Sequence, residues 1–405
     1  MNKPHSNSFC SRPFTSFYVS TSGRIQFCCA NNSIEIPPDT NIIETDLYAL
    51  WNSNYFQTIR RKLLENQIPA GCERQCFSVK LQSGYVDRSP RKNLLQHNQH
   101  RLSIGNTKLD AYNTFNASMS LSSITFIELW FSNKCNLQCR TCNPSCSDQL
   151  FAQWKHIPHV DQSLTNYSYD WTQYSQAWSN LLNFVGKIFE DNPCHKIEFV
   201  LSGGEPMINE NVYKFFDTMI ARGFAGNITL RFNTNLTVLP SKMINFWSNF
   251  YKIVLLISCD GIGSLNEYIR YPSKWDKIIS NLTLVKQLAF NNVELHFNIT
   301  VQNYNIFDVE SIVNWCKQYS HHVNLSILTR PKFLSIRSLP NHVKLLVSHD
   351  LKASKNLDVN KVLLHMLNED WSDEFYKFID YTKHIDATRK QNISVIRPEL
   401  QQYFN

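Results

Sequence analysis

The chain has 405 residues, of which 43% are hydrophobic and 18% are charged. This composition is typical of a folded protein with room for two or three domains, and it excludes an intrinsically disordered chain. The net charge of +7 arises from 40 basic and 33 acidic residues spread along the chain, so we do not expect a nucleic-acid-binding protein.

Apolar runs in the chain are short. No stretch approaches the ~18 consecutive apolar residues that a membrane span requires, and the strongest run, Ile253 to Ile257, has the length of a strand. The first residues, Met1 to Asn7, lack the apolar region of a secretory signal, so we expect no such signal. The twelve cysteines therefore indicate metal or redox chemistry rather than disulfides.

The first block of the chain, residues 1–90, is predicted to be a small cysteine-rich α+β module. Residues 17–20 and 24–27 are short β-prone runs joined by Thr21-Ser22-Gly23, and this pattern predicts a hairpin. Residues 46–66 have apolar side chains at helical spacing, which predicts one helix after the hairpin.

An alternation of strands and helices begins after residues 91–122, a polar stretch that we interpret as a connector. Six β-prone runs are separated by stretches of helical spacing, and they lie at residues 124–131, 197–201, 228–232, 253–258, 293–301 and 323–328. This pattern predicts an α/β fold over residues 123–339, with a parallel sheet that is open or curled into a partial (β/α)6 barrel. Residues 340–405 are predicted to be a helical C-terminal extension.

Three cysteines follow directly on the first predicted strand of this sheet. Cys135, Cys139 and Cys142 are spaced C-x3-C-x2-C, and three thiolates in one tight loop can hold three irons of a four-iron cluster while the fourth iron stays open. The alternative is a zinc site, which usually needs four ligands in paired C-x2-C elements. Cys146 is one cysteine more than the cluster needs, and we interpret it as a bystander.

A second motif, Ser202-Gly203-Gly204-Glu205-Pro206, follows the second predicted strand. Two adjacent glycines let a ligand approach the backbone closely, and an acidic group at a strand end suits an ammonium group. Alone, the four residues Gly-Gly-Glu-Pro fit a simple turn equally well. Its place at the end of a strand that follows the three cysteines favours a binding site.

With these two motifs on a six-strand α/β pattern, the chain resembles the radical S-adenosylmethionine superfamily. The resemblance implies a 4Fe-4S cluster on the three cysteines and S-adenosyl-L-methionine bound to it. The cofactor-binding residues that it implies are Gly203, Gly204, Glu205, Pro206, Ser258, Asp260, Arg270 and Asn298. The last four are weaker matches, for which a strand-end or capping role is the alternative. Thr141 stands where the family often has an aromatic or large apolar residue.

The first block carries a second set of cysteines. Cys10 and Cys28, with Gly23 between them in the spacing C-x12-G-x4-C, resemble the opening of the SPASM/twitch module, and Cys72 and Cys76 complete a four-thiolate set. Four thiolates close every iron, so the resemblance implies an auxiliary 4Fe-4S cluster that relays electrons or anchors substrate. Structural zinc is the alternative. In well-known relatives this module follows the barrel, whereas here it precedes it.

Cys29 is adjacent to Cys28 and offers a substitute ligand, but Cys28 has the matching spacing. Aromatic side chains gather in residues 144–179, where they either cover a substrate or pack in the core.

The resemblance also implies an enzyme, an oxidoreductase or maturase. One-electron cleavage of S-adenosylmethionine would give a 5′-deoxyadenosyl radical that takes a hydrogen atom from the substrate, which we expect to be a peptide or protein. The electron would come from an external donor such as flavodoxin or ferredoxin, and an oxygen-sensitive cluster favours the cytoplasm. The alternatives are oxidation of a carbohydrate-like small molecule, and a non-catalytic zinc or iron–sulfur protein.

Overall fold

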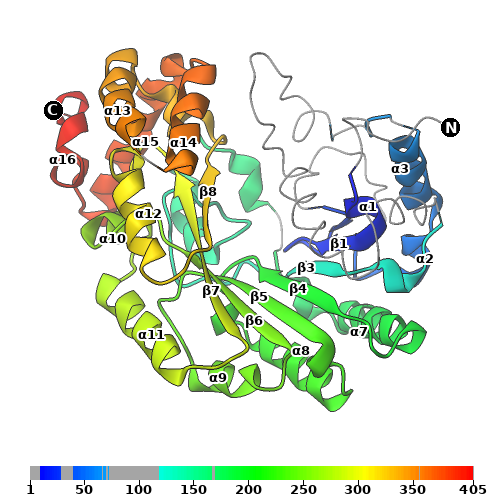
Figure 1. Cartoon of the computed structure of the whole chain (residues 1–405). Coiled ribbons are helices and arrows are strands. Elements are labelled where there is room, and N and C mark those ends of the chain that lie inside the picture. The colour runs from blue at the N-terminus through cyan, green and yellow to red at the C-terminus, as the bar shows by residue number, and fades with distance from the viewer. Residues whose placement is uncertain are drawn as a thin grey trace. The chain divides into compact units, whose positions relative to one another are not determined.

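The computed structural model describes residues 10–28, 40–65, 67–69, 72, 118–166, 169–354 and 356–404. The strands form one mostly parallel sheet with the order β2-β1-β3-β4-β5-β6-β7-β8 (Figure 1). The mixed α/β class predicted from the sequence is therefore confirmed. Among the described residues, no helix is both long enough and apolar enough to span a membrane.

The six strands predicted for the sheet are all present, and two further strands precede them. The strands are β1 (Ser16–Val19), β2 (Ile25–Gln26), β3 (Phe126–Trp130), β4 (Ile197–Ser202), β5 (Ile228–Thr234), β6 (Lys252–Ser258), β7 (Val293–Val301) and β8 (Val323–Ile327). The α-helices are α1 (Arg12–Thr15), α2 (Leu47–Trp51), α3 (Asn54–Leu64), α6 (Phe151–Trp154), α7 (Ser175–Asp191), α8 (Glu210–Ala221), α9 (Ser241–Trp247), α10 (Ser264–Ile269), α11 (Trp275–Leu288), α12 (Val309–Lys317), α13 (Asn341–Ala353), α14 (Leu357–Asn368), α15 (Phe375–Arg389) and α16 (Ile393–Ile396).

The first of two compact units comprises residues 1–132, 168–201 and 215–230. Strands β1 and β2 form the predicted hairpin, antiparallel with Tyr18 opposite Gln26. Gly23 turns the hairpin at φ +80°, a backbone conformation that glycine adopts at no steric cost. Strand β1 also pairs in parallel with β3, with Ser16 opposite Phe126. The hairpin of the N-terminal block is thus hydrogen-bonded to the first predicted strand of the α/β region.

The single helix predicted over residues 46–66 is two helices, α2 and α3. Asn52 ends α2, because its side-chain amide donates to the Met119 carbonyl at 2.8 Å and its side-chain oxygen accepts from the Met119 N–H at 3.0 Å. These side-chain bonds reach a residue distant in sequence, and no sequence periodicity reports them.

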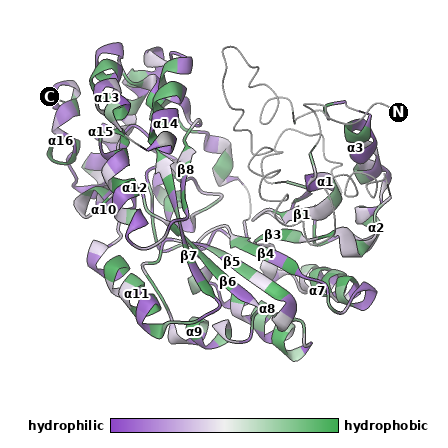
Figure 2. Cartoon of the chain, viewed as in Figure 1, coloured by the Kyte–Doolittle hydropathy of each residue, from purple (hydrophilic) through white to green (hydrophobic). Residues whose placement is uncertain are grey.

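The second unit comprises residues 133–167, 202–214 and 231–405. Its strands β6, β7 and β8 are parallel neighbours, with Ser258 opposite Asn298 and Asn298 opposite Asn324. Helices in Figure 2 are striped green and purple, as amphipathic helices are. Residues 340–405 contain helices α13 to α16, which confirms the predicted helical extension.

Much of the predicted connector lies outside the described residues, as does the boundary near residue 90. The four-part division into residues 1–90, 91–122, 123–339 and 340–405 stays a prediction.

Candidate functional site

The loop that carries Cys135, Cys139 and Cys142 is held by hydrogen bonds within the second unit. The backbone N–H of Cys135 donates to the Asp148 carboxylate at 3.1 Å. Two further N–H groups of the loop donate to carbonyls at the end of α10, that of Gln138 to Tyr271 at 2.6 Å and that of Arg140 to Ile269 at 2.8 Å. The loop therefore has a fixed backbone, although it contains no regular secondary structure across the three cysteines.

The three thiols are buried or half-buried and influence one another. Burial and the neighbouring Cys139 raise the pKa of Cys135 to about 12, and burial raises the pKa of Cys139 as well. The hydrogen bond that the Cys142 thiol donates to Cys146, followed by burial, raises the pKa of Cys142. The structure thus brings Cys146 to Cys142, a contact that the sequence interpretation of Cys146 as a bystander did not include. Metal binding at these thiols must release their protons.

The Gly-Gly-Glu-Pro motif meets this cysteine loop. The backbone N–H of Glu205 donates to the carbonyl of Lys134 at 2.9 Å, so the motif at the end of β4 touches the residue before Cys135. A Cβ atom on Gly204 would lie 2.0 Å from the same Lys134 carbonyl oxygen. Only glycine allows the two backbones to approach this closely.

Gly204→Ala is expected to lower the free energy of unfolding by about 1–3 kcal/mol, because a backbone carbonyl must move to admit the methyl group. Gly226→Ala is the matched control, since a Cβ there meets nothing within 4 Å and neither glycine has a positive φ. Chemical denaturation of the two variants measures the difference. Equal stabilities would show that the Gly204 contact imposes no constraint.

The Glu205 carboxylate is buried and oriented by three donors. Its two oxygens accept from the Thr234 hydroxyl at 2.9 Å, the Asn235 N–H at 2.8 Å and the Met207 N–H at 3.2 Å. Burial nevertheless raises its pKa to about 7, and these hydrogen bonds offset only part of that effect. A buried carboxyl poised near neutral pH is suited to receive a cationic group.

The polar residues after β5 close the same site. The Asn235 side chain donates to the Asn136 side chain at 2.9 Å, and the Asn136 amide donates to the Thr237 hydroxyl at 2.8 Å. Leu236 adopts a left-handed backbone, φ +53°, although it is a leucine. Glycine adopts this conformation at lower steric cost than leucine.

The four weaker sequence candidates lie on or beside β6 and β7. Arg270 donates to the buried Asp260 carboxylate at 2.7 Å, and the same carboxylate accepts from the Thr300 N–H at 2.7 Å. The Nε atom of Arg270 is buried and has no hydrogen-bond partner among the described residues. Ser258 and Asn298 are register partners on adjacent strands.

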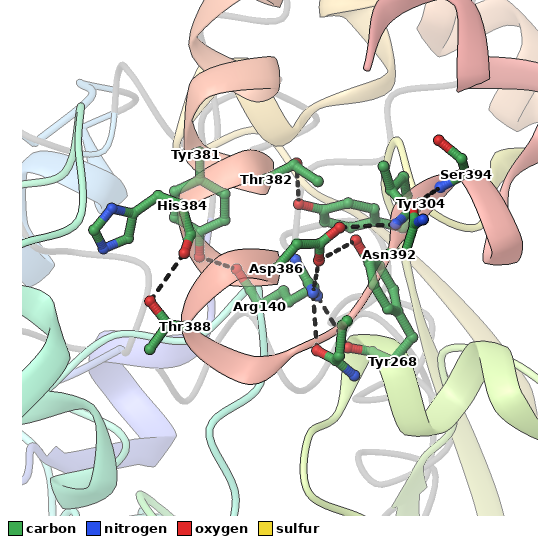
Figure 3. A network of polar contacts seen from close by, with 12 residues as sticks. Arg140, Tyr268, Tyr304, Tyr381, Thr382, His384, Asp386, Thr388, Asn392 and Ser394 are labelled. Atoms are coloured by element: carbon green, nitrogen blue, oxygen red, sulfur yellow. Dashed lines mark hydrogen bonds and ion pairs between the residues drawn. The ribbon is translucent and has the colours of Figure 1, made fainter. Parts of the chain in front are cut away.

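The structure adds a buried ion pair that sequence reasoning missed (Figure 3). Arg140, between Cys139 and Cys142, is fully buried and pairs with Asp386 on α15. Its guanidinium also donates to the Tyr268 carbonyl at 3.0 Å and to the Gln391 side chain at 2.9 Å. An arginine inside the C-x3-C-x2-C motif is the only signal in the sequence, because its carboxylate partner lies 246 positions later.

The structure describes three of the four cysteines predicted to bind the auxiliary cluster. Cys10, Cys28 and Cys72 are half-buried residues of the first unit. Cys28 comes two residues after β2, and Cys72 influences Tyr55 of α3, whose pKa is raised by burial and by that thiol. Cys76 and Cys29 lie outside the described residues, so the four-thiolate set stays a prediction.

The aromatic residues of 144–179 mostly pack inside the protein. Trp154 and Trp171 are buried, and their indole N–H groups donate to the carbonyls of Asp161 and Trp130. Trp171 also stacks on Phe131 with ring centroids 5.5 Å apart. Of the two roles considered for these aromatic residues, the two tryptophans pack in the core and do not cover a substrate.

Comparison with known proteins identifies a family for part of the chain. Residues 10–77 match the SPASM family, described as an iron-sulfur cluster-binding domain. The match begins at Cys10 and ends one residue after Cys76, so it contains all four auxiliary cysteines. No curated protein matches the chain.

Several solved structures are similar to the chain at low identity. Native anSMEcpe with bound AdoMet is 17% identical, with 56% of this chain and 59% of that chain covered and a TM-score of 0.39. SuiB of Streptococcus suis bound to precursor peptide SuiA is 14% identical, with 95% and 73% covered and a TM-score of 0.37. The chain thus spans less than two thirds of the anSMEcpe chain.

The SPASM match is one observation about this chain. A second is that the fold brings the cysteine loop after β3 into contact with Gly-Gly-Glu-Pro at the end of β4. The chain therefore contains a match to a SPASM iron–sulfur cluster-binding domain at residues 10–77, which precedes the cysteine loop.

Proposed function

We propose that the chain binds S-adenosyl-L-methionine on a 4Fe-4S cluster at Cys135, Cys139 and Cys142 and abstracts a hydrogen atom from a peptide or protein. The observation that carries the proposal is the hydrogen bond between the Glu205 N–H and the Lys134 carbonyl. This bond places the Gly-Gly-Glu-Pro motif against the cysteine loop, as a ligand shared by cluster and motif requires.

The residues of the site fit these groups. Three thiolates from one loop hold three irons, and the Glu205 carboxylate is oriented to accept the amino group of the methionine moiety. The partly unpartnered guanidinium of Arg270 suits the carboxylate of the same moiety. When bound, the reduced cluster and S-adenosylmethionine supply one-electron cleavage of the sulfonium and hydrogen-atom abstraction.

Side chains at the strand ends complete the proposed site. Ser258 and Asn298, opposite each other on β6 and β7, would bind the ribose. The Asn298 side-chain oxygen accepts from Asn324 at 2.6 Å and from Ser326 at 2.9 Å, which leaves its amide free to orient toward a hydroxyl. Asp260 would act by holding Arg270 rather than by touching the cofactor.

The SPASM domain gives the reaction its second electron-transfer site. After loss of a hydrogen atom, the substrate would pass one electron to a cluster held by Cys10, Cys28, Cys72 and Cys76, so the net change is a two-electron oxidation. The first electron would come from a donor of the ferredoxin or flavodoxin class. Such chemistry requires a reducing compartment, and we propose the cytoplasm.

Anaerobic reconstitution tests the proposal. Two four-iron clusters predict about eight irons per chain, and dithionite with S-adenosylmethionine should then yield 5′-deoxyadenosine. Stimulation of this yield by a peptide mixture, and not by a carbohydrate mixture, is expected for the substrate class. Bound zinc with no cleavage of S-adenosylmethionine would contradict the proposal.

Binding of S-adenosylmethionine is expected to tighten with pH. Burial raises the pKa of Glu205 to about 7, so at lower pH the carboxyl carries a proton that the cationic amino group must displace. The apparent affinity should therefore fall about tenfold per pH unit below about pH 7 and level off above it. Equilibrium dialysis of the reconstituted protein between about pH 6 and about pH 8 measures this dependence.

Glu205→Gln is the comparison for the pH dependence. It cannot ionise, so its affinity should be weaker than that of the wild type above about pH 7, should approach the wild-type value at lower pH, and should lack the rise across neutrality. If the wild-type affinity does not change with pH, a group other than Glu205 accepts the amino group of S-adenosylmethionine.

A further inference from the structure

The side chain of Arg389, the last residue of α15, is buried without a hydrogen bond. The residue is 8% exposed, and Nε, Nη1 and Nη2 all lack a hydrogen-bond partner among the described residues. Its guanidinium lies over the Tyr271 ring, 4.9 Å from the centroid. A buried cation without an anionic partner is unfavourable, so this guanidinium is suited to meet an anion that the chain itself does not provide.

Four other arginines of the same unit each have a carboxylate partner, which Arg389 lacks among the described residues. Arg140 pairs with Asp386, Arg270 with Asp260, Arg337 with Glu369 and Arg397 with Asp308. Each of these guanidinium groups therefore has a carboxylate close by. Burial lowers the pKa of Arg389 to about 10, so its side chain still carries a positive charge near neutral pH.

One contact of Arg389 and two contacts of other residues on α15 connect this helix end to the cysteine loop. The carbonyl of Tyr271, whose ring it covers, accepts from the N–H of Gln138 between Cys135 and Cys139. Asp386 lies one helical turn before Arg389 on α15 and pairs with Arg140 of the loop (Figure 3). The Tyr381 hydroxyl of the same helix donates to the Arg140 carbonyl at 2.6 Å.

The charge of Arg389 also acts on a cluster ligand. The guanidinium groups of Arg270 and Arg389 both interact electrostatically with the Cys139 thiol. Arg270 is already held by Asp260. Arg389 is thus a cation beside Cys139 that no carboxylate of the described residues neutralises.

We propose that Arg389 is a positioning residue whose guanidinium faces the cluster on Cys135, Cys139 and Cys142 and favours its reduced form. The inference rests on the proposed function. Three thiolates outweigh the positive charge of a four-iron core, so the cluster is anionic and gains one more negative charge when the external donor gives it an electron. A fixed cation in a site of low dielectric constant stabilises the more negative state more strongly.

The test compares three variants of the full chain after anaerobic reconstitution: Arg389→Gln, Arg389→Lys and Lys383→Gln. Lys383 is an exposed lysine on the same helix, so its replacement makes the same charge change away from the loop. Each variant is titrated potentiometrically while the electron paramagnetic resonance signal of the reduced cluster is recorded. The relevant signal is the one that Cys139→Ala removes.

Arg389→Gln is expected to keep its iron and to lower the ratio of reduced to oxidised cluster at a fixed potential about tenfold, or about 59 mV for one electron. Arg389→Lys should restore most of this ratio, and Lys383→Gln should not change it. If Arg389→Gln loses its iron, retention in Arg389→Lys supports the inference, whereas loss in both variants indicates a packing role and overturns it.

An unchanged potential in a fully loaded Arg389→Gln variant would also overturn the inference while leaving the proposed function intact. Failure of the proposed function is seen separately, as a wild-type protein that assembles no cluster on Cys135, Cys139 and Cys142. That result would overturn both.

Discussion

Cys139→Ala is expected to remove about four of about eight irons per chain and to abolish formation of 5′-deoxyadenosine, because two remaining thiolates cannot hold three irons. The effect on stability should be small by comparison, since the loop is held by backbone hydrogen bonds to Tyr271, Ile269 and Asp148 rather than by the thiol. Iron analysis and chromatography of the reaction products measure the two losses.

Cys146→Ser is the matched control for this prediction. Cys146 lies in the same loop and is hydrogen-bonded to Cys142, but the C-x3-C-x2-C set is complete without it. The variant should therefore retain all of its iron. A loss of iron equal to that of Cys139→Ala would mean four thiolates on one cluster, with no open iron for a cofactor, and would contradict the proposed function.

Arg140→Ala is expected to lower the free energy of unfolding by about 3–5 kcal/mol, because it leaves the buried Asp386 carboxylate without its cation. Asp386 would keep only the Tyr268 hydroxyl at 2.9 Å and the Ile393 N–H at 2.7 Å. Since Arg140 lies between two of the proposed cluster ligands, the loaded variant should also lose iron faster to a chelator. Chemical denaturation and the rate of iron release measure these effects.

The exposed Lys383 of α15 again supplies a control. Lys383→Ala removes one positive charge from the same helix and should change stability by less than about 0.5 kcal/mol. A double variant, Arg140→Met with Asp386→Leu, separates the ion pair from its surroundings, and it should recover much of the stability that Arg140→Ala loses. A cost below about 1 kcal/mol for Arg140→Ala would show that water reaches Asp386.

The strands and the two motifs were predictable from local patterns in the sequence. A run of β-prone residues bounded by turn residues depends on its own side chains, and all six predicted strands of the sheet are present. The hairpin at Gly23 was predictable for the same reason, because one glycine permits the positive φ that the turn needs. The helix at residues 46–66 was only partly correct, since its interruption at Asn52 depends on Met119.

For the site, the sequence identified the residue types and the structure decided their partners. Cys135, Cys139, Cys142 and Glu205 were found because their spacing and their place after strands are visible in the chain. That Glu205 is bonded to the residue before Cys135 is a tertiary fact.

By itself, the sequence determined the α/β class, the two cysteine sets and the Gly-Gly-Glu-Pro motif, because each depends on residues that are neighbours along the chain. Only the tertiary structure decided that Arg140 is neutralised by Asp386, that Glu205 is buried enough to titrate near neutral pH, and that Arg389 beside Cys139 has no hydrogen-bond partner in the part of the chain that the structure describes. These properties come from burial and from charges brought together over long sequence distances, and burial is what strengthens electrostatic interactions in a protein interior.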